Sequence, residues 1–230
     1  MPKRTIQILK TLFILLIPIL ILTAAVRLLA TDQYLAFEYG KTTFPRDQFG
    51  FTDRQRFILA STNIHYVRAH LPNDELSKQT LDGIPVYSPR EVSHMADVRT
   101  VFETVLFTGK ITLLLLLLIA LSLWQKGEQR MLGSAIQWGG LLTSAFIFTI
   151  GLLAIFSWQS WFNTFHLFFF EPGSWLFSYS DTLIRLFPVE FWFDATLTIS
   201  ALGLIGGLIT ALVGWKWQMA LNRDTELIPL

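Results

Sequence analysis

Two histidines, His94 and His166, are the residues of this sequence best suited to move protons near neutral pH, because imidazole titrates in that range. Asp97 follows His94 by three positions. Residues three apart are neighbours on a helix surface, so Asp97 could accept a hydrogen bond from one ring nitrogen and orient the imidazole. Each histidine also has an ordinary interpretation, as a helix-surface or interfacial side chain without a catalytic role. The residues alone leave both interpretations open.

A helix that carries His94 is predicted to continue without a break into the membrane. Ser88, Pro89 and Glu91 form an S-P-x-E start, in which serine caps a free backbone N–H, proline suits the first turn and glutamate reaches back. The apolar run ends at position 124, and about 20 residues of helix cross the hydrocarbon layer. The span therefore covers residues 104–124, which puts His94 in or just above the headgroup layer.

The sequence lacks the motifs of common hydrolases. It has no cysteine, no G-x-S-x-G elbow, no H-E-x-x-H zinc motif and no glycine-rich phosphate loop. His65 and His70 are five positions apart, a spacing that does not place both on one helix face. We therefore interpret them as surface histidines and expect neither a metal ion nor a cofactor.

The composition indicates an all-α integral membrane protein. Of the 230 residues 52% are hydrophobic and eight are Trp, and the apolar residues gather in long runs. The runs predict four transmembrane helices in a single membrane domain, with spans of about 11–29, 104–124, 132–158 and 191–217 in residues 1–230. The net charge is only +1 and no basic stripe is present, so nucleic acid is not an expected partner.

Basic residues are concentrated on one side of the predicted spans. They precede the first span, occupy the loop 125–130 and follow the last span. Because such residues stay inside, we expect both termini to be cytoplasmic and residues 31–103 and 159–190 to lie outside. A cleaved signal peptide is the alternative for the first span, but its apolar core would usually be about 7–15 residues, shorter than this run.

The larger outer segment, residues 31–103, is the sizeable polar region of the chain. Thr52 and Gln55 form a second capping-box pattern, and helical periodicity follows it as far as His70. We therefore expect a small, mainly helical extracellular lid between spans one and two.

The second outer segment, residues 159–190, surrounds His166 with aromatic side chains and breaks at Pro172-Gly173. Aromatic rings suit the headgroup layer, so this pattern is typical of an interfacial segment between spans three and four. His94 and His166 are therefore expected at a similar depth on the same side of the membrane.

Three local motifs carry a resemblance to a known family. Residues 87–98 read Y-S-P-R-E-V-S-H-M-x-D-V, residues 165–177 read F-H-x-x-F-F-x-P-G-x-W-x-F, and residues 183–192 read L-I-R-L-F-P-V-E-F-W. In these motifs, and in length, span count and order, the chain resembles the lipoprotein intramolecular transacylases (Lit) of Gram-positive bacteria. The two histidines associated with activity in that family match His94 and His166.

The resemblance implies an acyltransferase of lipoprotein biosynthesis in a bacterial plasma membrane. The sn-2 acyl group of a diacylglyceryl lipoprotein would pass to the α-amine of its own N-terminal cysteine, giving an N-acylated lyso-form. Such an enzyme needs a proton acceptor, a donor for the developing oxyanion or leaving alkoxide, and a site open to the outer leaflet. We expect His94 as the base, oriented by Asp97, and His166 as the donor. The expected partners are the diacylated lipoprotein and membrane lipid, and we expect a monomer.

Four further residues are candidate substrate contacts. Arg99 and Arg185 could hold a lipid phosphate or a substrate carbonyl, although interfacial arginines often bind lipid nonspecifically. Tyr87 and Glu171 lie within the first two motifs and are the other candidates.

Two other classes of protein compete with the enzyme. A non-enzymatic membrane factor could bind a partner through its outer lid. A transporter is the weaker alternative, because residues 111–123 and 195–213 contain no ionisable side chain, whereas a solute or proton path needs some. The enzyme requires His94 and His166 to converge, and the accessory protein does not.

Overall fold

The computed structural model is mainly helical and describes residues 2–226, with side chains for residues 2–223. Over that range the helices are α1 (Lys3–Leu29), α2 (Asp32–Tyr39), α3 (Asp53–Val67), α4 (Glu75–Lys78), α5 (Pro89–Gln125), α6 (Gln129–Phe156), α7 (Trp158–Phe169), α8 (Thr182–Leu186) and α9 (Val189–Glu226). The strands β1 (Thr80–Leu81) and β2 (Ile84–Pro85) form a short antiparallel hairpin. The prediction of an all-α membrane protein is confirmed.

Four helices, α1, α5, α6 and α9, are long and apolar enough to cross a membrane, as the sequence predicted. They begin earlier than the predicted spans because each helix also includes polar residues next to its apolar run. α6 ends at Phe156 rather than at the predicted Trp158, because Ser157 breaks the helix before α7 begins. α5 confirms the unbroken helix expected from Ser88 onwards.

The residues divide into two compact units. Unit 1 comprises Met1–Ala25, Phe107–Leu152 and Thr198–Leu230, and unit 2 comprises Val26–Leu106 and Leu153–Leu197. The four long helices contribute residues to both units. His94 and His166 both belong to unit 2, so the candidate site is described within one unit.

Unit 1 is held together by apolar side chains and by close helix packing. Its core consists of Ile6, Phe13 and Ile17 of α1, Leu116, Ile119 and Leu123 of α5, and Leu132 and Ala135 of α6. A Cβ added to Gly140 of α6 would lie 2.4 Å from backbone atoms of Gly207 and Ala211 in α9. α6 and α9 therefore approach backbone to backbone, as small residues allow membrane helices to do.

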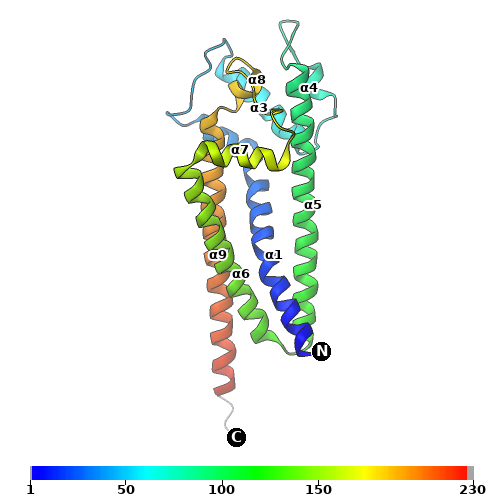
Figure 1. Ribbon diagram of the computed structural model, residues 1–230, viewed down its shortest axis with the longest axis vertical. Helices are drawn as coiled ribbons and strands as arrows, with labels where there is room; N and C mark the ends of the chain where they lie inside the picture. The colour runs from blue at the N-terminus through cyan, green and yellow to red at the C-terminus, as the bar shows by residue number, and fades with distance from the viewer. Residues whose placement is uncertain (1, 227–230) are drawn as a thin grey trace. The chain divides into compact units, whose positions relative to one another are not determined.

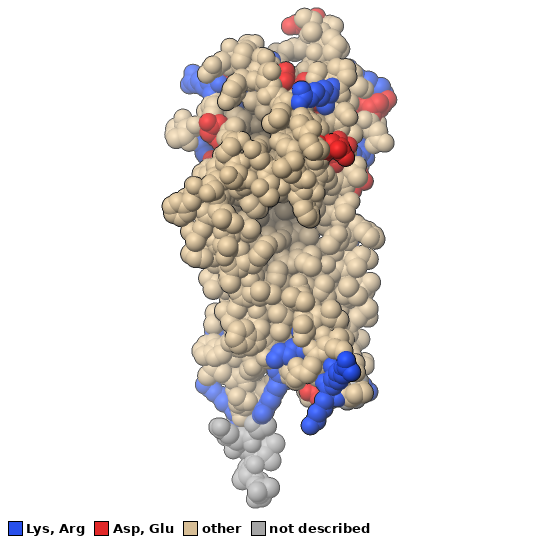
Figure 2. All heavy atoms as spheres, in the orientation of Figure 1, with Lys and Arg blue, Asp and Glu red and all other residues tan. Residues whose placement is uncertain are grey.

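Basic side chains gather at one end of unit 1. Figure 2 shows them at its lower end, below an uncharged flank. Figure 1 shows the start of α1 and the end of α9 at this same end. A basic rim beside an uncharged flank is the pattern of membrane helices where they leave the hydrocarbon layer.

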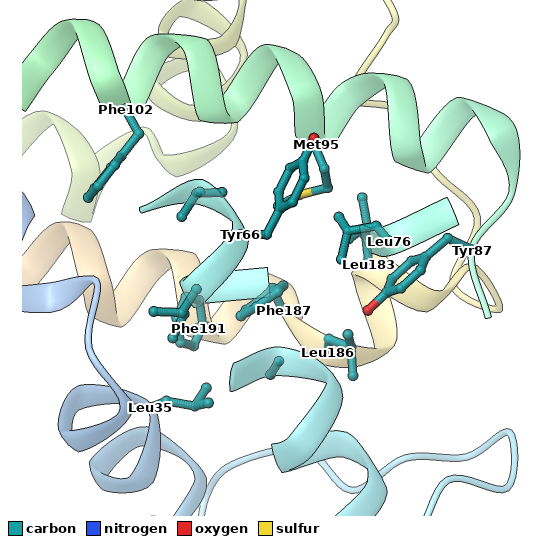
Figure 3. Packing of buried hydrophobic residues seen from close by; sticks show 13 residues of the cluster. Leu35, Tyr66, Leu76, Tyr87, Met95, Phe102, Leu183, Leu186, Phe187 and Phe191 are labelled. Atoms are coloured by element: carbon teal, nitrogen blue, oxygen red, sulfur yellow. The ribbon is translucent and has the colours of Figure 1, made fainter. Parts of the chain in front are cut away.

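Unit 2 is built around a mixed aromatic and aliphatic core, to which helices far apart in the sequence contribute (Figure 3). Its labelled members are Leu35, Tyr66, Leu76, Tyr87, Met95, Phe102, Leu183, Leu186, Phe187 and Phe191. Successive residues on an α-helix point about 100° apart. Met95 can therefore enter this core while its neighbour His94 packs against another segment.

Two capping boxes start helices of unit 2, and both were predicted from the sequence. Glu91 Oε2 accepts hydrogen bonds from Ser88 N and Ser88 Oγ at 2.8 and 2.9 Å, at the start of α5. Thr52 and Gln55 form the reciprocal pair at the start of α3. Glu91 Oε1 also accepts from Leu183 N at 2.8 Å, so one buried carboxylate joins α5 to α8.

The outer segments differ from the prediction in three details. α2 was not predicted, and α3 ends at Val67 rather than continuing to His70. The backbone after α3 reaches a positive φ of 58° at Ala69, which no helix continues through. The aromatic segment contains a helix of its own, α7, which lies across the direction of the first turns of α5 (Figure 1).

Candidate active site

His94 lies on the second turn of α5 and is buried, with 9% of its surface exposed. Its ring centroid is 5.0 Å from that of Phe170 and 5.5 Å from that of Phe177. Nδ1 of His94 is buried and has no hydrogen-bond partner among the described residues. This nitrogen is therefore available to an atom that the protein itself does not provide.

His166 lies near the end of α7 and is half-buried. Its Nδ1 is 2.8 Å from the carbonyl oxygen of Phe162, one turn earlier. A carbonyl only accepts, so Nδ1 carries the proton and donates, and in the neutral ring the lone pair lies on Nε2. Burial lowers the pKa of His166, and the hydrogen bond to Phe162 opposes this shift without cancelling it. The imidazole is thus a neutral base at pH 7, fixed in one tautomer.

Phe170 brings the two histidines together. Its ring lies 5.0 Å from His94 and 5.7 Å from His166, measured between centroids. The imidazoles are close enough for a charge on one to act on the other. Side chains that are 72 positions apart in sequence therefore share one aromatic neighbour, as the enzyme interpretation required.

The loop after α7 is fixed to α5 by Arg90. The guanidinium Nη2 of Arg90 donates to the carbonyl oxygen of Gly173 at 2.7 Å and to that of Leu176. Cζ of the same guanidinium lies 5.1 Å from the ring centroid of Phe177. Gly173 has a φ of 84°, a conformation that glycine adopts without strain. Sequence reasoning missed Arg90, although it lies four residues before His94 and hence on the same helix face.

The loop fixed by Arg90 carries Trp175, which is buried with 8% exposure. The ring centroid of Trp175 lies 5.3 Å from that of His166. Nε1 of Trp175 and Oγ of Ser174 are buried, and neither has a hydrogen-bond partner in the part of the chain that the structure describes. Sequence reasoning also missed Trp175, although this residue belongs to the second motif, residues 165–177.

The predicted contact between Asp97 and His94 is not formed. Asp97 is exposed, and Nδ1 of His94 has no partner. Three residues of helix leave the two side chains about 60° apart in direction, so the spacing permits this contact but does not require it. The ring of His94 packs on Phe170 and Phe177, while the carboxylate of Asp97 stays exposed. The expectation that Asp97 orients His94 is therefore wrong.

Three of the four predicted substrate contacts, Arg99, Arg185 and Tyr87, have hydrogen-bond partners within the protein. Arg99 donates to Glu103 and to the carbonyl oxygen of Leu71, at 2.9 and 3.0 Å. Arg185 forms a two-point ion pair with Asp47, at 2.8 and 3.1 Å.

Tyr87 is buried in the core, where its hydroxyl oxygen accepts from Nδ2 of Asn63 at 2.6 Å. Glu171 is exposed at the start of the loop that follows α7. Of the four candidates, Glu171 is therefore nearest in sequence to the aromatic cluster around His166.

His65 and His70 form a separate pair. Nδ1 of His65 lies 3.4 Å from Nδ1 of His70, and Nε2 of His65 lies 3.0 Å from a carboxylate oxygen of Asp32. His65 is near the end of α3, and His70 follows the helix. The contact between the two rings is exposed, which agrees with the interpretation of both residues as surface histidines.

Comparison with known proteins gives the family and the fold of this chain. The family model of lipoprotein intramolecular transacylase Lit matches residues 11–192. An uncharacterised protein of Aquifex aeolicus (strain VF5) is 27% identical over 209 residues, which is 90% of this chain and 94% of that protein.

Solved structures show the same fold. The membrane integral lipoprotein intramolecular transacylase Lit from Bacillus cereus is 17% identical, with a TM-score of 0.63 over 96% of this chain and 99% of that one. A variant of that protein with one histidine replaced by arginine gives a TM-score of 0.59 at 17% identity, over 96% and 95% of the two chains. The chain, with its four apolar helices, belongs to the lipoprotein intramolecular transacylase (Lit) family of acyltransferases.

Proposed function

We propose that this protein moves the sn-2 acyl group of a diacylglyceryl lipoprotein to the α-amine of the same N-terminal cysteine, with His94 and His166 as an acid–base pair. The observation that carries the proposal is the packing of both imidazoles against Phe170, where each ring keeps a nitrogen without a hydrogen-bond partner among the described residues. The substrate supplies the amine nucleophile and the ester electrophile. The protein then has to position them and move one proton.

His166 is the better base of the two. Its Nδ1 proton is held by the carbonyl oxygen of Phe162, so Nε2 can accept a proton from the attacking amine. The reason for choosing His94 as base was Asp97, and that contact is not formed. His94 is instead suited to the leaving-group side of the reaction, where a ring N–H donates to the departing glycerol oxygen.

The reaction balances within one substrate molecule. The amine nitrogen forms a bond to the ester carbonyl carbon, and the bond from that carbon to the glycerol oxygen breaks. The proton lost by the amine passes through the imidazole pair to the glycerol oxygen, so no water, metal or added donor is consumed. Aromatic rings from Phe162, Phe170, Phe177 and Trp175 surround the histidines and limit competition by water for the ester.

We further propose that both termini are cytoplasmic and that unit 2 acts at the outer leaflet. The basic end of unit 1, which contains the start of α1 and the end of α9, supports this orientation (Figures 1 and 2). The proposed partners are the diacylated lipoprotein and membrane lipid, with the protein acting as a monomer.

The test is an isotope crossover experiment with the purified protein and a diacylglyceryl-cysteine lipopeptide. The product is an isomer of the substrate, so it is recognised by fragment ions that carry an N-acyl chain and by loss of the free amine. When equal amounts of a lipopeptide with ordinary chains and one with deuterated chains are mixed, no crossed product should form. An α-N-acetylated lipopeptide is the matched control and should not react. Crossed products, or an unchanged amine, would contradict the proposal.

A further inference from the structure

Trp175 combines three properties that a structural tryptophan rarely combines. It is more than nine-tenths buried, its ring packs against a proposed catalytic imidazole, and its indole N–H has no acceptor among the described residues. An indole N–H can only donate, and buried tryptophans usually find a partner for it. A buried donor without an acceptor destabilises the free protein, so its retention indicates an acceptor that arrives with a ligand.

The backbone around Trp175 is held in place independently of the ring. Arg90 fixes the carbonyl oxygens of Gly173 and Leu176, on either side of Trp175, to the first turns of α5. The same helix carries His94, four residues after Arg90. The indole donor and the imidazole of His94 are therefore positioned by one set of contacts, as a preorganised site requires.

The proposed reaction creates one hydrogen-bond acceptor for which neither histidine is the donor. As the amine attacks, the carbonyl π pair moves onto the carbonyl oxygen, which becomes an oxyanion. His166 takes the amine proton and His94 acts at the glycerol oxygen. The carbonyl oxygen needs a donor that keeps its own proton throughout, and an indole N–H does not ionise in this pH range.

We propose that Nε1–H of Trp175 donates a hydrogen bond to the carbonyl oxygen of the scissile sn-2 ester and stabilises the oxyanion of the tetrahedral intermediate. The inference rests on the proposed function, and it makes Trp175 a catalytic residue of that reaction. Oxyanion donors act mainly in the transition state, so their loss lowers kcat more than it raises KM.

The first variant is Trp175→Phe, which keeps an aromatic ring and removes the donor. Loss of one oxyanion donor typically lowers kcat by roughly 10²–10³-fold, and we expect a fall in that range with KM changed by less than about 3-fold. Trp161→Phe is the matched control. Trp161 lies on α7 and packs on Phe165, and its replacement should leave the rate unchanged.

A shape-preserving replacement separates the donor from ring packing. 3-Benzothienylalanine at position 175 has sulfur in place of the indole N–H, so it fills the same space without donating. It should be as slow as Trp175→Phe. The parental rate with this replacement would overturn the inference, because packing would be intact and the donor absent.

The substrate provides the second half of the test. In a lipopeptide whose sn-2 carbonyl oxygen is replaced by sulfur, a weak acceptor, the ratio of parental to Trp175→Phe rates should fall from roughly 10² towards 1. A ratio that stays at its ester value would also overturn the inference. If the parental protein makes no lyso-form from the oxygen ester, the proposed function has failed. If it does and Trp175→Phe matches it, only the role of Trp175 has failed.

Discussion

Two sides of unit 2 differ in how their charged or titratable side chains are paired, although Asn63 Oδ1 of α3 is also buried without a hydrogen-bond partner among the described residues. On the side made by α2, α3, α8 and residues 40–51, the buried charges have partners within the protein. Glu38 is fully buried and pairs with Lys41 at 2.7 Å, and Asp47 pairs with Arg185 at 2.8 Å. On the side made by α7, residues 170–177 and His94 of α5, buried polar atoms of His94, Ser174 and Trp175 have no partner among the described residues.

This difference indicates that the side with paired groups stabilises the fold and that the side with unpaired groups is available for the reaction. Polar groups that are paired within the protein contribute to stability and position, and their hydrogen-bonding capacity is not available to a substrate. Unpaired buried groups destabilise the free protein and remain available for one. Substitutions on the two sides should therefore affect different measurements.

The largest effect is expected for the histidines. His94→Ala and His166→Ala should each abolish detectable formation of the lyso-form, because each acid–base role is typically worth about 10²–10⁴-fold in rate. The protein should still insert and melt near the parental temperature, which is checked by a thermal scan in detergent. An alanine variant with normal product formation would remove that histidine from the mechanism.

A substitution on the paired side should affect stability instead. Burial acts to raise the pKa of Asp47, but hydrogen bonds from Arg185 and from the amides of Phe51 and Phe49 outweigh it and hold the pKa below its usual value. Removing one partner of a buried pair typically costs about 3–5 kcal/mol, so Asp47→Ala should lower the melting temperature substantially. The rate per folded molecule should stay near the parental value.

Asp74→Ala is the matched control for Asp47→Ala. Asp74 pairs with Lys78 at the exposed α4, where solvent screens the pair, so the melting temperature should not change measurably. Equal shifts for the two variants would contradict the distinction between a buried and an exposed pair. A kinetic defect in folded Asp47→Ala would contradict the division of unit 2 into two sides.

The pH dependence of the rate should be moderate and should identify the base. The α-amine of the substrate loses its proton near pH 7.7–8, about 1.5 units above the ordinary pKa of histidine. The pKa of His166 is lowered, chiefly by burial, so the base stays neutral below pH 6.5 and becomes protonated only at lower pH. His94 is the titratable ring that shares Phe170 with it, and Arg90 is the charged group nearby on α5.

A plot of log rate against pH should therefore have a slope of about 1 from pH 7 to below 6.5, because only the substrate amine titrates there. The slope should approach 2 only below the lowered pKa of His166, where the base becomes protonated as well. Steepening centred at or above 6.5 would show that the base has an ordinary or raised pKa. The measurement uses initial rates with the lipopeptide in mixed buffers of constant ionic strength.

Local sequence patterns correctly predicted the structural features that depend only on residues close together in the sequence. The Ser88–Glu91 and Thr52–Gln55 boxes form as expected because each needs only residues three apart. The four membrane spans were predicted from the length of the apolar runs in the sequence. The nearness of His94 and His166 followed from the family resemblance and from two segments expected at one membrane depth.

The contacts that could not be predicted join residues far apart in the chain. Arg185 and Asp47 are separated by 138 positions, and Arg90 reaches a carbonyl 83 positions away. No local pattern distinguishes an arginine that pairs within the protein from one that binds lipid, so Arg185 was assigned to substrate. Trp175 lay inside a quoted motif, but only the structure reveals that its N–H lacks an acceptor.

The smallest effect is expected for Asp97→Asn, and it is the sharpest test of what the structure adds to the sequence. The spacing of Asp97 and His94 predicted an orienting hydrogen bond, and loss of such a bond would slow the reaction because the imidazole would lose its fixed tautomer. In the structure Asp97 is exposed and Nδ1 of His94 is unpartnered. The substitution therefore removes one solvated charge, which should change kcat by less than about 2-fold, since an exposed charge is worth little.

A matched variant on the other histidine sharpens this prediction. The tautomer of His166 is set by a backbone carbonyl one turn earlier, so it is changed by displacing the ring rather than by removing a side-chain partner. His166→Gln keeps polar atoms near that position but supplies no base, and it should be as inactive as His166→Ala. If Asp97→Asn slowed the reaction 10-fold or more while His166→Gln retained activity, the base would be His94, oriented by Asp97 in a conformation that differs from this structure. The two lipopeptide rates, measured side by side at pH 7, therefore decide which histidine takes the proton.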